Sequence, residues 1–594
     1  MIVSYIQYPE NSVASLIARF LKQRGVKKVF GLCGGHIMPI WMCLYREGIS
    51  IIDTRDERAA VHMAHAHAEV TGELGVALVT AGPGVTNAVT GVANAHLSRV
   101  PILVISGVPP IPQENRGALQ DLVHTDLLGS ITRYARTVRD PFLALQELDQ
   151  AVTHAQGDGS DPGPVYLDFP TNILRQVVAP HLQLEEHFRA KAKCKMLPDP
   201  MAVEKAIELL WSAKRPLIIS GRGARSCGQQ IVNLLDRISA LYLDSSDSRG
   251  LVPDDHPSLV NAIRGKILNQ ADVIVTIGRK LDFQLAYGSP AIFGEAKFLR
   301  IADAPSELRD NRRGVVELFA SPAASIEAII KGAKNRQSEA DKEWARASRR
   351  EHQERAKALT QILEEAPTGK DGLMHPNRLL GILRKKLSNS TTVIADGGDF
   401  LSFARVALTG DTYLDPGPMG CLGVGIPFGI AASLARPDRV TLVASGDGAF
   451  GFNAIEIDTA VRHKAPLLIV IANNGAWQIE THDQHINYGV VVGTRLQFAD
   501  YASMARSFGM YAERIERCED LDKAIDRAID HRPALLDVLV TPEAISSDAK
   551  SGLAVVPDLQ PLVVWDRQEK EWRASVKQKK EWGIRINRWT ASAG

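Results

Sequence analysis

Two patterns of apolar and polar positions alternate over the first third of the chain. Residues 13–25 carry apolar side chains at helical spacing. Asn11-Ser12 directly before them suits a helix start, and Gly25 suits a helix end. Short, almost wholly apolar runs are separated by further helical patterns; these runs are KVFGLCG, ISIID, GVALVTAG and PILVISG. Because strands buried on both faces lack polar alternation, this order predicts a mostly parallel sheet covered by helices.

The same pattern begins again twice. RPLIISGRGA, ADVIVTIG and FLRI are strand-like runs in the middle of the chain, and TVIADGG, RVTLVASGDG, PLLIVIANN and ALLDVLV follow a highly charged stretch. That stretch is typical of a surface helix that connects two domains. The sequence therefore predicts an α/β protein with three doubly wound parallel-sheet domains at 1–188, 195–335 and 373–545, a linker helix at 336–372 and a C-terminal extension at 546–594.

Composition narrows the class of protein. The 594 residues include 69 Lys and Arg against 68 Asp and Glu, and this balance argues against a protein built mainly to bind nucleic acid. Because 45% of the residues are hydrophobic, a mainly disordered chain is not expected. The six cysteines form no C-x-x-C pair, so we expect neither a disulfide scaffold nor a zinc site. No long apolar run and no signal-peptide pattern is present, so we expect a cytoplasmic protein without a membrane partner.

The C-terminal extension has a different composition. It contains four tryptophans, and residues 566–588 hold eight Lys and Arg against four Asp and Glu. Two interpretations are open: the extension docks on the protein's own surface, or it closes as a lid over an anionic ligand.

The strongest chemical signal is a Gly-Asp-Gly turn at the end of an apolar run. Asp447 lies between Gly446 and Gly448, and Asn474 follows the next apolar run 27 residues later. Because parallel strands end at the same edge of a sheet, both side chains are expected in one crevice. Carboxylate and amide oxygens suit Mg²⁺, and a helix that starts near Ala449 offers free N–H groups to a diphosphate.

This arrangement resembles the diphosphate- and magnesium-binding motif of thiamine diphosphate (ThDP) enzymes. The resemblance extends over nearly the whole chain, in the three-domain order of the acetolactate synthase and oxalyl-CoA decarboxylase group. It implies that Asp447, Asn474 and the backbone carbonyl of Ala476 bind Mg²⁺. DPGPMGCLGVGIP and ADGGDFLS resemble two further cofactor-contacting segments. The resemblance implies that the Gly420 carbonyl accepts a hydrogen bond from the aminopyrimidine and that Leu422 bends the cofactor into a V shape. It places Gly398, Asp399 and Phe400 on the diphosphate side.

RDERAAVHMAHAHAEVTG resembles the family segment that presents a catalytic glutamate, here Glu57. The resemblance implies that its carboxyl hydrogen-bonds the pyrimidine N1′ and favours the imino form, whose 4′-nitrogen removes the C2 proton. An apolar pocket raises the pKa of a carboxyl toward the value that this role needs. AGPGVTNAVTG completes the resemblance. Because the family builds its site from two subunits, we expect a homo-oligomer, at least a dimer and usually a tetramer.

Two cations bear on the substrate. GRKLDFQLAYG resembles the loop that contacts coenzyme A in oxalyl-CoA decarboxylases and 2-hydroxyacyl-CoA lyases, with Lys280 at its basic position. Arg405 falls where those enzymes place another phosphate-binding arginine. Two cations facing one cleft would suit the phosphates of an acyl-CoA. The glycine-rich GRGARSCG (221–228) either contacts ADP or another nucleotide in the central domain or forms a plain turn.

Other candidates would contact the reacting part of the substrate. Gln120 matches the active-site glutamine of acetolactate synthases and 2-hydroxyacyl-CoA lyases. Glu480 matches a pocket glutamate of pyruvate decarboxylase-like relatives and would move a proton at the substrate hydroxyl, unless it lies on the surface. His124 could also reach the substrate, and a packed histidine is an equal alternative for it. Gly35 and His36 are weaker candidates.

The resemblance thus implies a ThDP- and Mg²⁺-dependent lyase, most similar to 2-hydroxyacyl-CoA lyase. It would cleave a 2-hydroxyacyl-CoA between C1 and C2 to formyl-CoA and an aldehyde or ketone, and the reverse reaction is a carboligation. The main alternative is an acetolactate synthase-like or benzaldehyde lyase-like enzyme acting on free 2-keto acids or acyloins. A non-catalytic relative is a further alternative, which the joint retention of Glu57, Asp447 and Asn474 disfavours.

Overall fold

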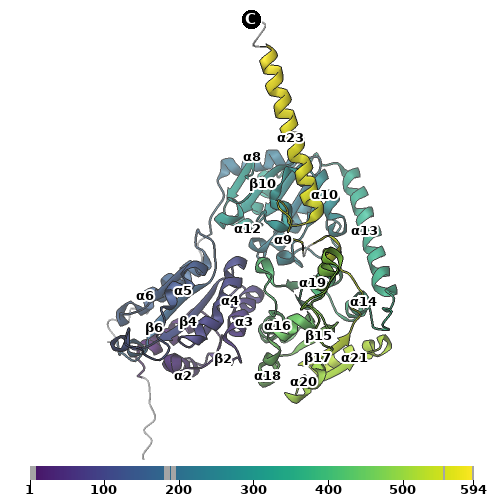
Figure 1. Ribbon diagram of the computed structural model, residues 1–594. Helices are drawn as coiled ribbons and strands as arrows, with labels where there is room; N and C mark the ends of the chain where they lie inside the picture. Colours follow the sequence, from purple (N-terminus) through teal and green to yellow (C-terminus); the bar gives the residue numbers. More distant parts are fainter. Residues whose placement is uncertain (1–8, 179–187, 189–194, 553–554, 591–594) are drawn as a thin grey trace, which may run out of the picture. The chain divides into compact units, whose positions relative to one another are not determined.

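The computed structural model describes residues 9–178, 188, 195–552 and 555–590, with side chains as far as Lys577 (Figure 1). Contacts divide the chain into two compact units. The first unit comprises residues 1–194, 370–475 and 497–541, and the second comprises residues 195–369, 476–496 and 542–594. The first unit contains two α/β blocks, one before and one after the middle block in the sequence, and the second unit contains the middle block.

The first block is a six-stranded parallel sheet with the order β2-β1-β3-β4-β6-β5. All four strand-like runs predicted here are confirmed as strands. The strands are β1 (Lys28–Gly31), β2 (Ser50–Asp53), β3 (Gly75–Val79), β4 (Ile102–Val108), β5 (Tyr134–Thr137) and β6 (Val165–Pro170). The helices are α1 (Val13–Gln23), α2 (Met38–Arg46), α3 (Glu57–Thr71), α4 (Pro83–Ser98), α5 (His124–Leu128), α6 (Ala144–Gln156) and α7 (Thr171–Leu174).

The third block is another six-stranded parallel sheet, with the order β13-β12-β14-β15-β17-β16. Its strands are β12 (Thr392–Asp396), β13 (Thr412–Leu414), β14 (Thr441–Gly446), β15 (Leu467–Asn473), β16 (Tyr511–Ile515) and β17 (Ala534–Leu539). Its helices are α14 (Pro376–Lys386), α15 (Asp399–Ala407), α16 (Gly425–Ala435), α17 (Asp447–Gly451), α18 (Ile457–Arg462), α20 (Tyr501–Ser507) and α21 (Cys518–Asp530). Strand order is therefore the same in both blocks.

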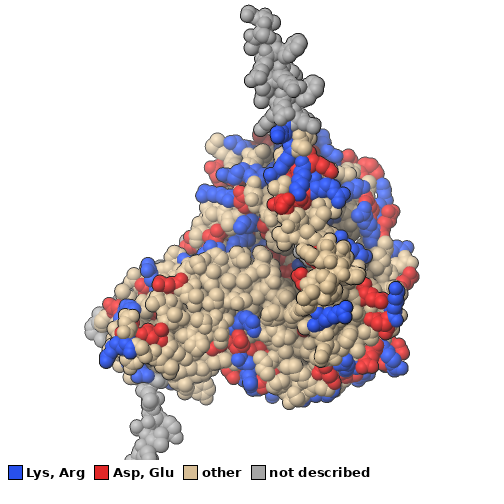
Figure 2. Space-filling view, viewed as in Figure 1, with Lys and Arg blue, Asp and Glu red and all other residues tan. Residues whose placement is uncertain are grey.

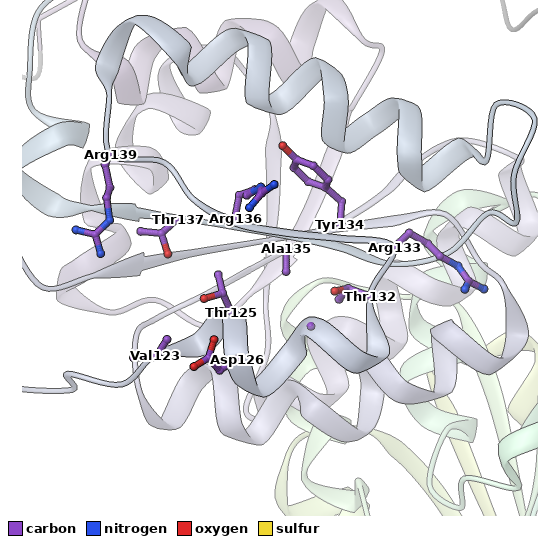
Figure 3. Close-up of a pocket in the computed structure, with 11 residues that line it drawn as sticks. Val123, Thr125, Asp126, Thr132, Arg133, Tyr134, Ala135, Arg136, Thr137 and Arg139 are labelled. Atoms are coloured by element: carbon purple, nitrogen blue, oxygen red, sulfur yellow. The ribbon is translucent and has the colours of Figure 1, made fainter.

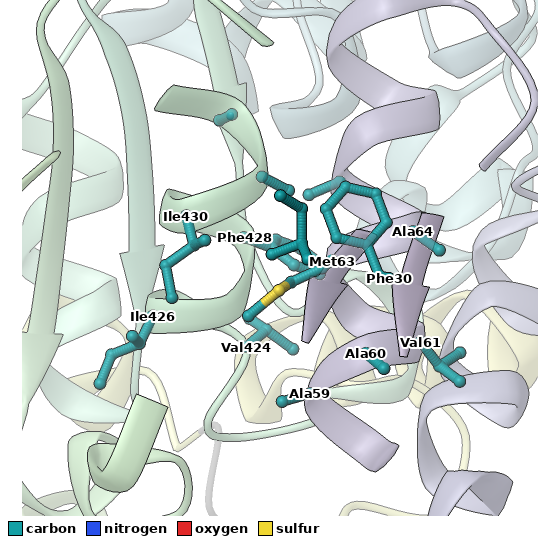
Figure 4. Close-up of a cluster of buried hydrophobic side chains, with 14 of the residues drawn as sticks. Phe30, Ala59, Ala60, Val61, Met63, Ala64, Val424, Ile426, Phe428 and Ile430 are labelled. Carbon is teal, nitrogen blue, oxygen red and sulfur yellow. The ribbon is translucent and has the colours of Figure 1, made fainter. Parts of the chain in front are cut away.

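Helices α3 and α16 join the two blocks of the first unit (Figure 4). Alanines on α3, such as Ala60 and Ala64, allow close approach, and Met63 packs with Phe428 and Ile430 of α16 in one buried cluster. A helix that is apolar on nearly every face, as α16 is, has to be buried on several sides. This shared core joins the two blocks within the first unit.

The middle block has a five-stranded parallel sheet, with the order β11-β10-β9-β7-β8. Its strands are β7 (Pro216–Ser220), β8 (Leu241–Leu243), β9 (Val273–Ile277), β10 (Lys297–Ala302) and β11 (Val316–Phe319). Its helices are α8 (Pro200–Trp211), α9 (Gly228–Ile238), α10 (Arg264–Gln270), α11 (Pro290–Phe293) and α12 (Pro322–Gly332). The charged stretch that follows contains the expected helix, α13 (Lys342–Glu365). The predicted fold class, three parallel-sheet α/β domains, is confirmed.

The C-terminal extension contains α22 (Ser547–Lys550) and α23 (Val563–Thr590). Trp565 packs against an apolar cluster of the middle block, and the buried carboxylate of Glu569 accepts hydrogen bonds from Ser289 and from Gln560 Nε2, the latter at 3.2 Å. The first turns of α23 therefore dock on the protein's own surface. Trp582 and Trp589 lie outside the described side chains, so a lid role for the far end of α23 stays a prediction.

Charge is distributed in agreement with the balanced composition. Figure 2 shows Lys and Arg next to Asp and Glu on the visible face of the molecule. In the part of the chain that the structure describes, no helix is long and apolar enough to cross a membrane.

Candidate functional site

The Gly-Asp-Gly turn and Asn474 meet at one edge of the third sheet. Strand β14 pairs with β15 up to Gly446 and Ala472, so the two strands end side by side. Asp447 begins α17 and is buried, with 2% of its surface exposed. Its carboxylate accepts hydrogen bonds from the backbone N–H groups of Asn474 and Gly475. The structure thus brings these two predicted site residues together, as their spacing suggested.

The charge of Asp447 suits a cation. Burial raises the pKa of this carboxyl to about 6, although four backbone N–H groups oppose the shift. Its Oδ2 atom is buried and has no hydrogen-bond partner within the described chain. A buried oxygen without a partner is costly, and a bound Mg²⁺ would satisfy it. The residues present therefore fit the metal that the sequence implies.

The other implied ligands lie directly after β15. Asn474 is partly exposed. Ala476 and Arg495 both belong to the second unit and form an antiparallel bridge with each other. Among the described residues, no group of three or more His, Cys, Asp and Glu could hold a metal. That finding does not conflict with the implied set, which has one carboxylate, one amide and one backbone carbonyl.

The diphosphate-side loop lies beside the Gly-Asp-Gly turn. Strand order changes direction between β12 and β14, and such a switch point opens a crevice at the carboxyl ends of the strands. A Cβ built on Gly397 would lie 3.5 Å from the backbone nitrogen of Gly446. Gly398 then caps α15, whose first residues, Asp399 and Phe400, are buried. These positions surround the place expected for the diphosphate.

The loop that carries Gly420 and Leu422 is held by a carboxylate that sequence reasoning missed. Asp396, at the end of β12, accepts the N–H groups of Gly423 at 3.0 Å and of Gly425 at 2.8 Å. Burial raises the pKa of Asp396 to about 7, against the hydrogen bonds from those N–H groups. The available signal was an acidic residue at the end of the predicted strand TVIADGG.

Glu57 is the first residue of α3. Asp56 caps this helix by accepting the N–H of Arg58 at 2.7 Å, and Glu57 is 6% exposed. The Glu57 carboxylate accepts a hydrogen bond from Asn87 Nδ2 at 3.0 Å, and a Cβ on Gly84 would lie 3.2 Å from its Oε1. The segment AGPGVTN therefore shapes the pocket of this carboxyl, and Asn87 is a second residue that sequence reasoning missed.

His36 and Gln120 meet at the carboxyl ends of β1 and β3. Gln120 has a left-handed backbone, with φ of +63°, and packs so closely on Gly82 that a Cβ there would lie 2.8 Å from its own. Its side chain hydrogen-bonds His36, and burial lowers the pKa of that imidazole. Gly35 precedes His36 and is exposed. Two predicted substrate contacts therefore form one polar pair.

His124 is buried beneath this pair, with 1% of its surface exposed. Its Nε2 accepts the N–H of Gly82 at 2.9 Å, so the ring proton lies on Nδ1. Nδ1 faces Asp168 Oδ2 at 3.3 Å and the Tyr166 hydroxyl at 3.0 Å. Both ring nitrogens are engaged, which favours the packed alternative for His124.

The structure places the predicted coenzyme A contacts in different units. Arg405, on α15 of the first unit, forms an ion pair with the buried Asp415 at 3.3 Å. Lys280 follows β9 in the second unit and is partly exposed. Its neighbour Arg279 is buried and paired with Asp282 at 2.9 Å. That Lys280 and Arg405 face one cleft stays a prediction.

Two other predicted residues or segments belong to the second unit. Glu480 lies on α19 (Gln478–Asp483) and is exposed in the single chain. In the segment 221–228, a Cβ on Gly223 would lie 2.7 Å from Glu307 Oε2 and 2.8 Å from the Cα of Gly278. The glycine is thus required by close packing between two loops, which favours a plain turn at that position.

A cavity of about 680 Å³ lies between α5 and β5 in the first block (Figure 3). Three arginines are among the residues that line it, but none of the predicted site residues does so. Its lining residues are Val123, Thr125, Asp126, Gly129, Thr132, Arg133, Tyr134, Ala135, Arg136, Thr137 and Arg139.

Comparison with known families covers all three blocks. Residues 11–128 match the family described as thiamine pyrophosphate enzyme, N-terminal TPP binding domain. Residues 203–329 match its central domain, and residues 396–538 match its C-terminal TPP binding domain. The acetolactate synthase large subunit IlvG of Mycobacterium tuberculosis is 33% identical over 555 residues, which is 91% of this chain and 97% of that protein.

The chain belongs to the thiamine pyrophosphate enzyme family. It is also similar to 2-hydroxyacyl-CoA lyase 2 of Homo sapiens, 30% identical over 578 residues (88% of this chain, 89% of that protein), and of Caenorhabditis elegans, 29% identical over 574 residues (88% and 89%). This ThDP enzyme is therefore one of the acetolactate synthase and 2-hydroxyacyl-CoA lyase group. The predictions of the family, the fold and ThDP as cofactor are confirmed.

Proposed function

We propose that this ThDP enzyme is a Mg²⁺-dependent lyase that cleaves a 2-hydroxyacyl-CoA to formyl-CoA and an aldehyde or ketone. Similarity to 2-hydroxyacyl-CoA lyases, which extends through the central domain, carries the proposal. Lys280 and Arg405 add support, because two cations suit the phosphates of coenzyme A.

The residues have separate tasks in this proposal. Asp447, Asn474 and the carbonyl of Ala476 hold Mg²⁺. The diphosphate is bound by Gly446, Gly448, Ala449, Gly398, Asp399 and Phe400. Gly420 and Leu422 hold the aminopyrimidine end, and Glu57 supplies a carboxyl to it. When bound, ThDP supplies the carbanion chemistry that makes the C1–C2 bond of the substrate cleavable.

The polar pair in the first block serves the substrate hydroxyl. Cleavage between C1 and C2 releases the proton of the C2 hydroxyl, and C1 gains a hydrogen to become the formyl carbon. Because burial lowers the pKa of His36, its imidazole is neutral near pH 7 and can accept that hydroxyl proton. Gln120 orients the imidazole, and Glu480 is the second candidate for the same proton transfer.

The active enzyme is a homo-oligomer in this proposal, at least a dimer. Glu57 of one copy completes the cofactor site that Asp447 of another copy begins. The far end of α23 covers the coenzyme A arm, and deletion of residues 561–594 is expected to raise KM for the acyl-CoA substrate. Unchanged kinetics in that variant would rule out the lid.

A product assay tests the choice of reaction. The purified protein, with ThDP and Mg²⁺, is offered a short 2-hydroxyacyl-CoA and, separately, pyruvate, and products are identified by mass spectrometry. Formyl-CoA with a carbonyl product from the acyl-CoA is the expected result. Acetolactate or another acyloin from pyruvate, with the acyl-CoA intact, would overturn the proposal.

The second candidate is a carboligase or decarboxylase acting on free 2-keto acids or acyloins. Two observations favour it: the 33% identity to an acetolactate synthase, and the ion pair that Arg405 already makes with Asp415. Lys280→Ala separates the two candidates, because only coenzyme A binding requires that cation. We expect a rise of about tenfold in KM for the acyl-CoA, at unchanged kcat, and no change in Lys331→Ala, a matched exposed lysine on α12.

A further inference from the structure

Close packing constrains Gly423, in the loop that carries Gly420 and Leu422. It directly follows Leu422, and its backbone is left-handed, with φ of +89°. A Cβ at this position would lie 2.4 Å from the Cβ of Phe452, just after the helix that begins with Asp447. The backbone of the Leu422 loop therefore lies directly on the end of α17.

The peptide groups on both sides of Gly423 are held by buried side chains. Its N–H donates to Asp396 Oδ2 at 3.0 Å, and its carbonyl accepts from Asn453 Nδ2 at 2.6 Å. Asp396 and Asn453 are each 1% exposed. Because hydrogen bonds in a dry site are strong and costly to break, this clamp leaves Leu422 little freedom to move.

Arg58 extends the clamp to the helix of Glu57. Its guanidinium donates to the Phe452 carbonyl at 2.9 Å and to Asn453 Oδ1 at 3.3 Å. The Asn453 amide therefore donates on one side and accepts on the other. An aspartate of the same shape has no N–H to give and would repel the Gly423 carbonyl.

We propose that Asn453 is a positioning residue. With Asp396 and Arg58 it fixes the position of Leu422, and so it determines where the aminopyrimidine of bound ThDP lies. The inference rests on the proposed roles of Gly420 and Leu422 but not on the choice of substrate. Asn453 touches neither substrate nor metal in this account, and it acts through the Gly423 carbonyl.

The exchange of the C2 proton of bound ThDP for deuterium reports on this placement without any substrate. We expect Asn453→Asp, saturated with ThDP and Mg²⁺, to exchange about 10- to 100-fold more slowly than the wild type, because a small misplacement of the reacting groups costs this much. The affinity for ThDP, measured by calorimetry, changes less than the exchange rate, because the Asp447 edge is intact. Asn233→Asp, the same change on an exposed position of α9, is the control and leaves both unchanged.

The outcomes separate the alternatives. Exchange within twofold of the wild type in saturated Asn453→Asp would overturn the positioning role, even if stability or affinity had fallen. If that variant does not fold, Arg58→Met decides, with an expected slowing of about three- to tenfold, and an unchanged rate would overturn the proposal. A wild-type protein that binds ThDP but does not accelerate exchange contradicts the proposed function instead.

Discussion

The sheet of β1–β6 and the sheet of β12–β17 have the same strand order when each is counted from its own first strand. Their third strands end in different turns. Strand β3 leads into Ala81-Gly82-Pro83, and β14 leads into Gly446-Asp447-Gly448. The first turn presents no charge beside Gln120, whereas the second presents a buried carboxylate beside Asn474.

This difference suits the two tasks that we propose for the two sheets. In both sheets the strand ends define the place where loops converge, and the residues in the loops decide the chemistry. In the proposed function, the third block binds the cation and the diphosphate. The first block presents Glu57 at the start of a helix and the His36 and Gln120 pair to the substrate. Mutations at corresponding edges should therefore fail in different ways.

Glu57→Gln should have the largest effect, and it should be confined to chemistry. Turnover is expected to fall about 10²- to 10⁴-fold because the amide cannot take part in proton transfer, while ThDP affinity remains near that of the wild type. Steady-state kinetics and calorimetry check the two parts, with the exposed Glu365→Gln as the control. Loss of ThDP binding in Glu57→Gln would remove the distinction between the blocks.

Asp447→Asn should give the opposite failure. Replacing the one carboxylate of the implied metal set is expected to weaken Mg²⁺-dependent ThDP binding by about 100-fold, with some turnover recovered at high cofactor concentration. Titration of ThDP at several Mg²⁺ concentrations measures this, and Asp530→Asn on α21 is the matched control. An unchanged cofactor affinity would place the metal elsewhere.

Glu456 tests the junction of the two blocks. This buried carboxyl accepts the N–H of Arg55 at 3.0 Å and the Thr459 hydroxyl at 2.6 Å, and burial raises its pKa to about 7. An unfolded glutamate titrates near pH 4.3, so between about pH 4.3 and 7 the folded state binds more protons and loses stability as pH rises. The group carries no such penalty at lower pH.

The Glu456→Gln variant should lack this pH dependence. Between pH 5 and 7.5, the free energy of unfolding of the wild type is expected to fall by roughly 2–4 kcal/mol relative to the variant. Denaturant titrations of both proteins across that range measure the difference. Parallel curves would mean that Glu456 is ionised in the folded state at all these values.

His124→Leu should have the smallest effect. It leaves the buried Gly82 N–H without a partner and the Asp168 carboxylate with the Tyr166 hydroxyl alone, so the free energy of unfolding is expected to fall by about 1–3 kcal/mol. Turnover falls through the displaced Gln120, while KM for ThDP stays constant. The exposed His154→Leu serves as the control, and a variant with normal stability but no substrate binding would revive a direct contact.

Much of the fold could be predicted because strands buried on both faces leave continuous apolar runs, as in residues 102–108 and 467–473. Short strands such as β13, with three residues, leave no such run. The meeting of Asp447 and Asn474 could be predicted because each directly follows a strand of six or seven residues. Asn453, Asn87 and Asp396 could not, because their importance comes from partners that only the folded chain brings near, such as Gly423 and Glu57.

Complementation tests the division of tasks most directly. Glu57→Gln and Asp447→Asn, each nearly inactive alone, are co-expressed with different affinity tags, and mixed oligomers are purified through both tags. If Glu57 of one copy completes the Asp447 site of another, a mixed dimer has one intact site and about half the wild-type activity. Mixed oligomers as inactive as their parents would contradict a site shared between copies.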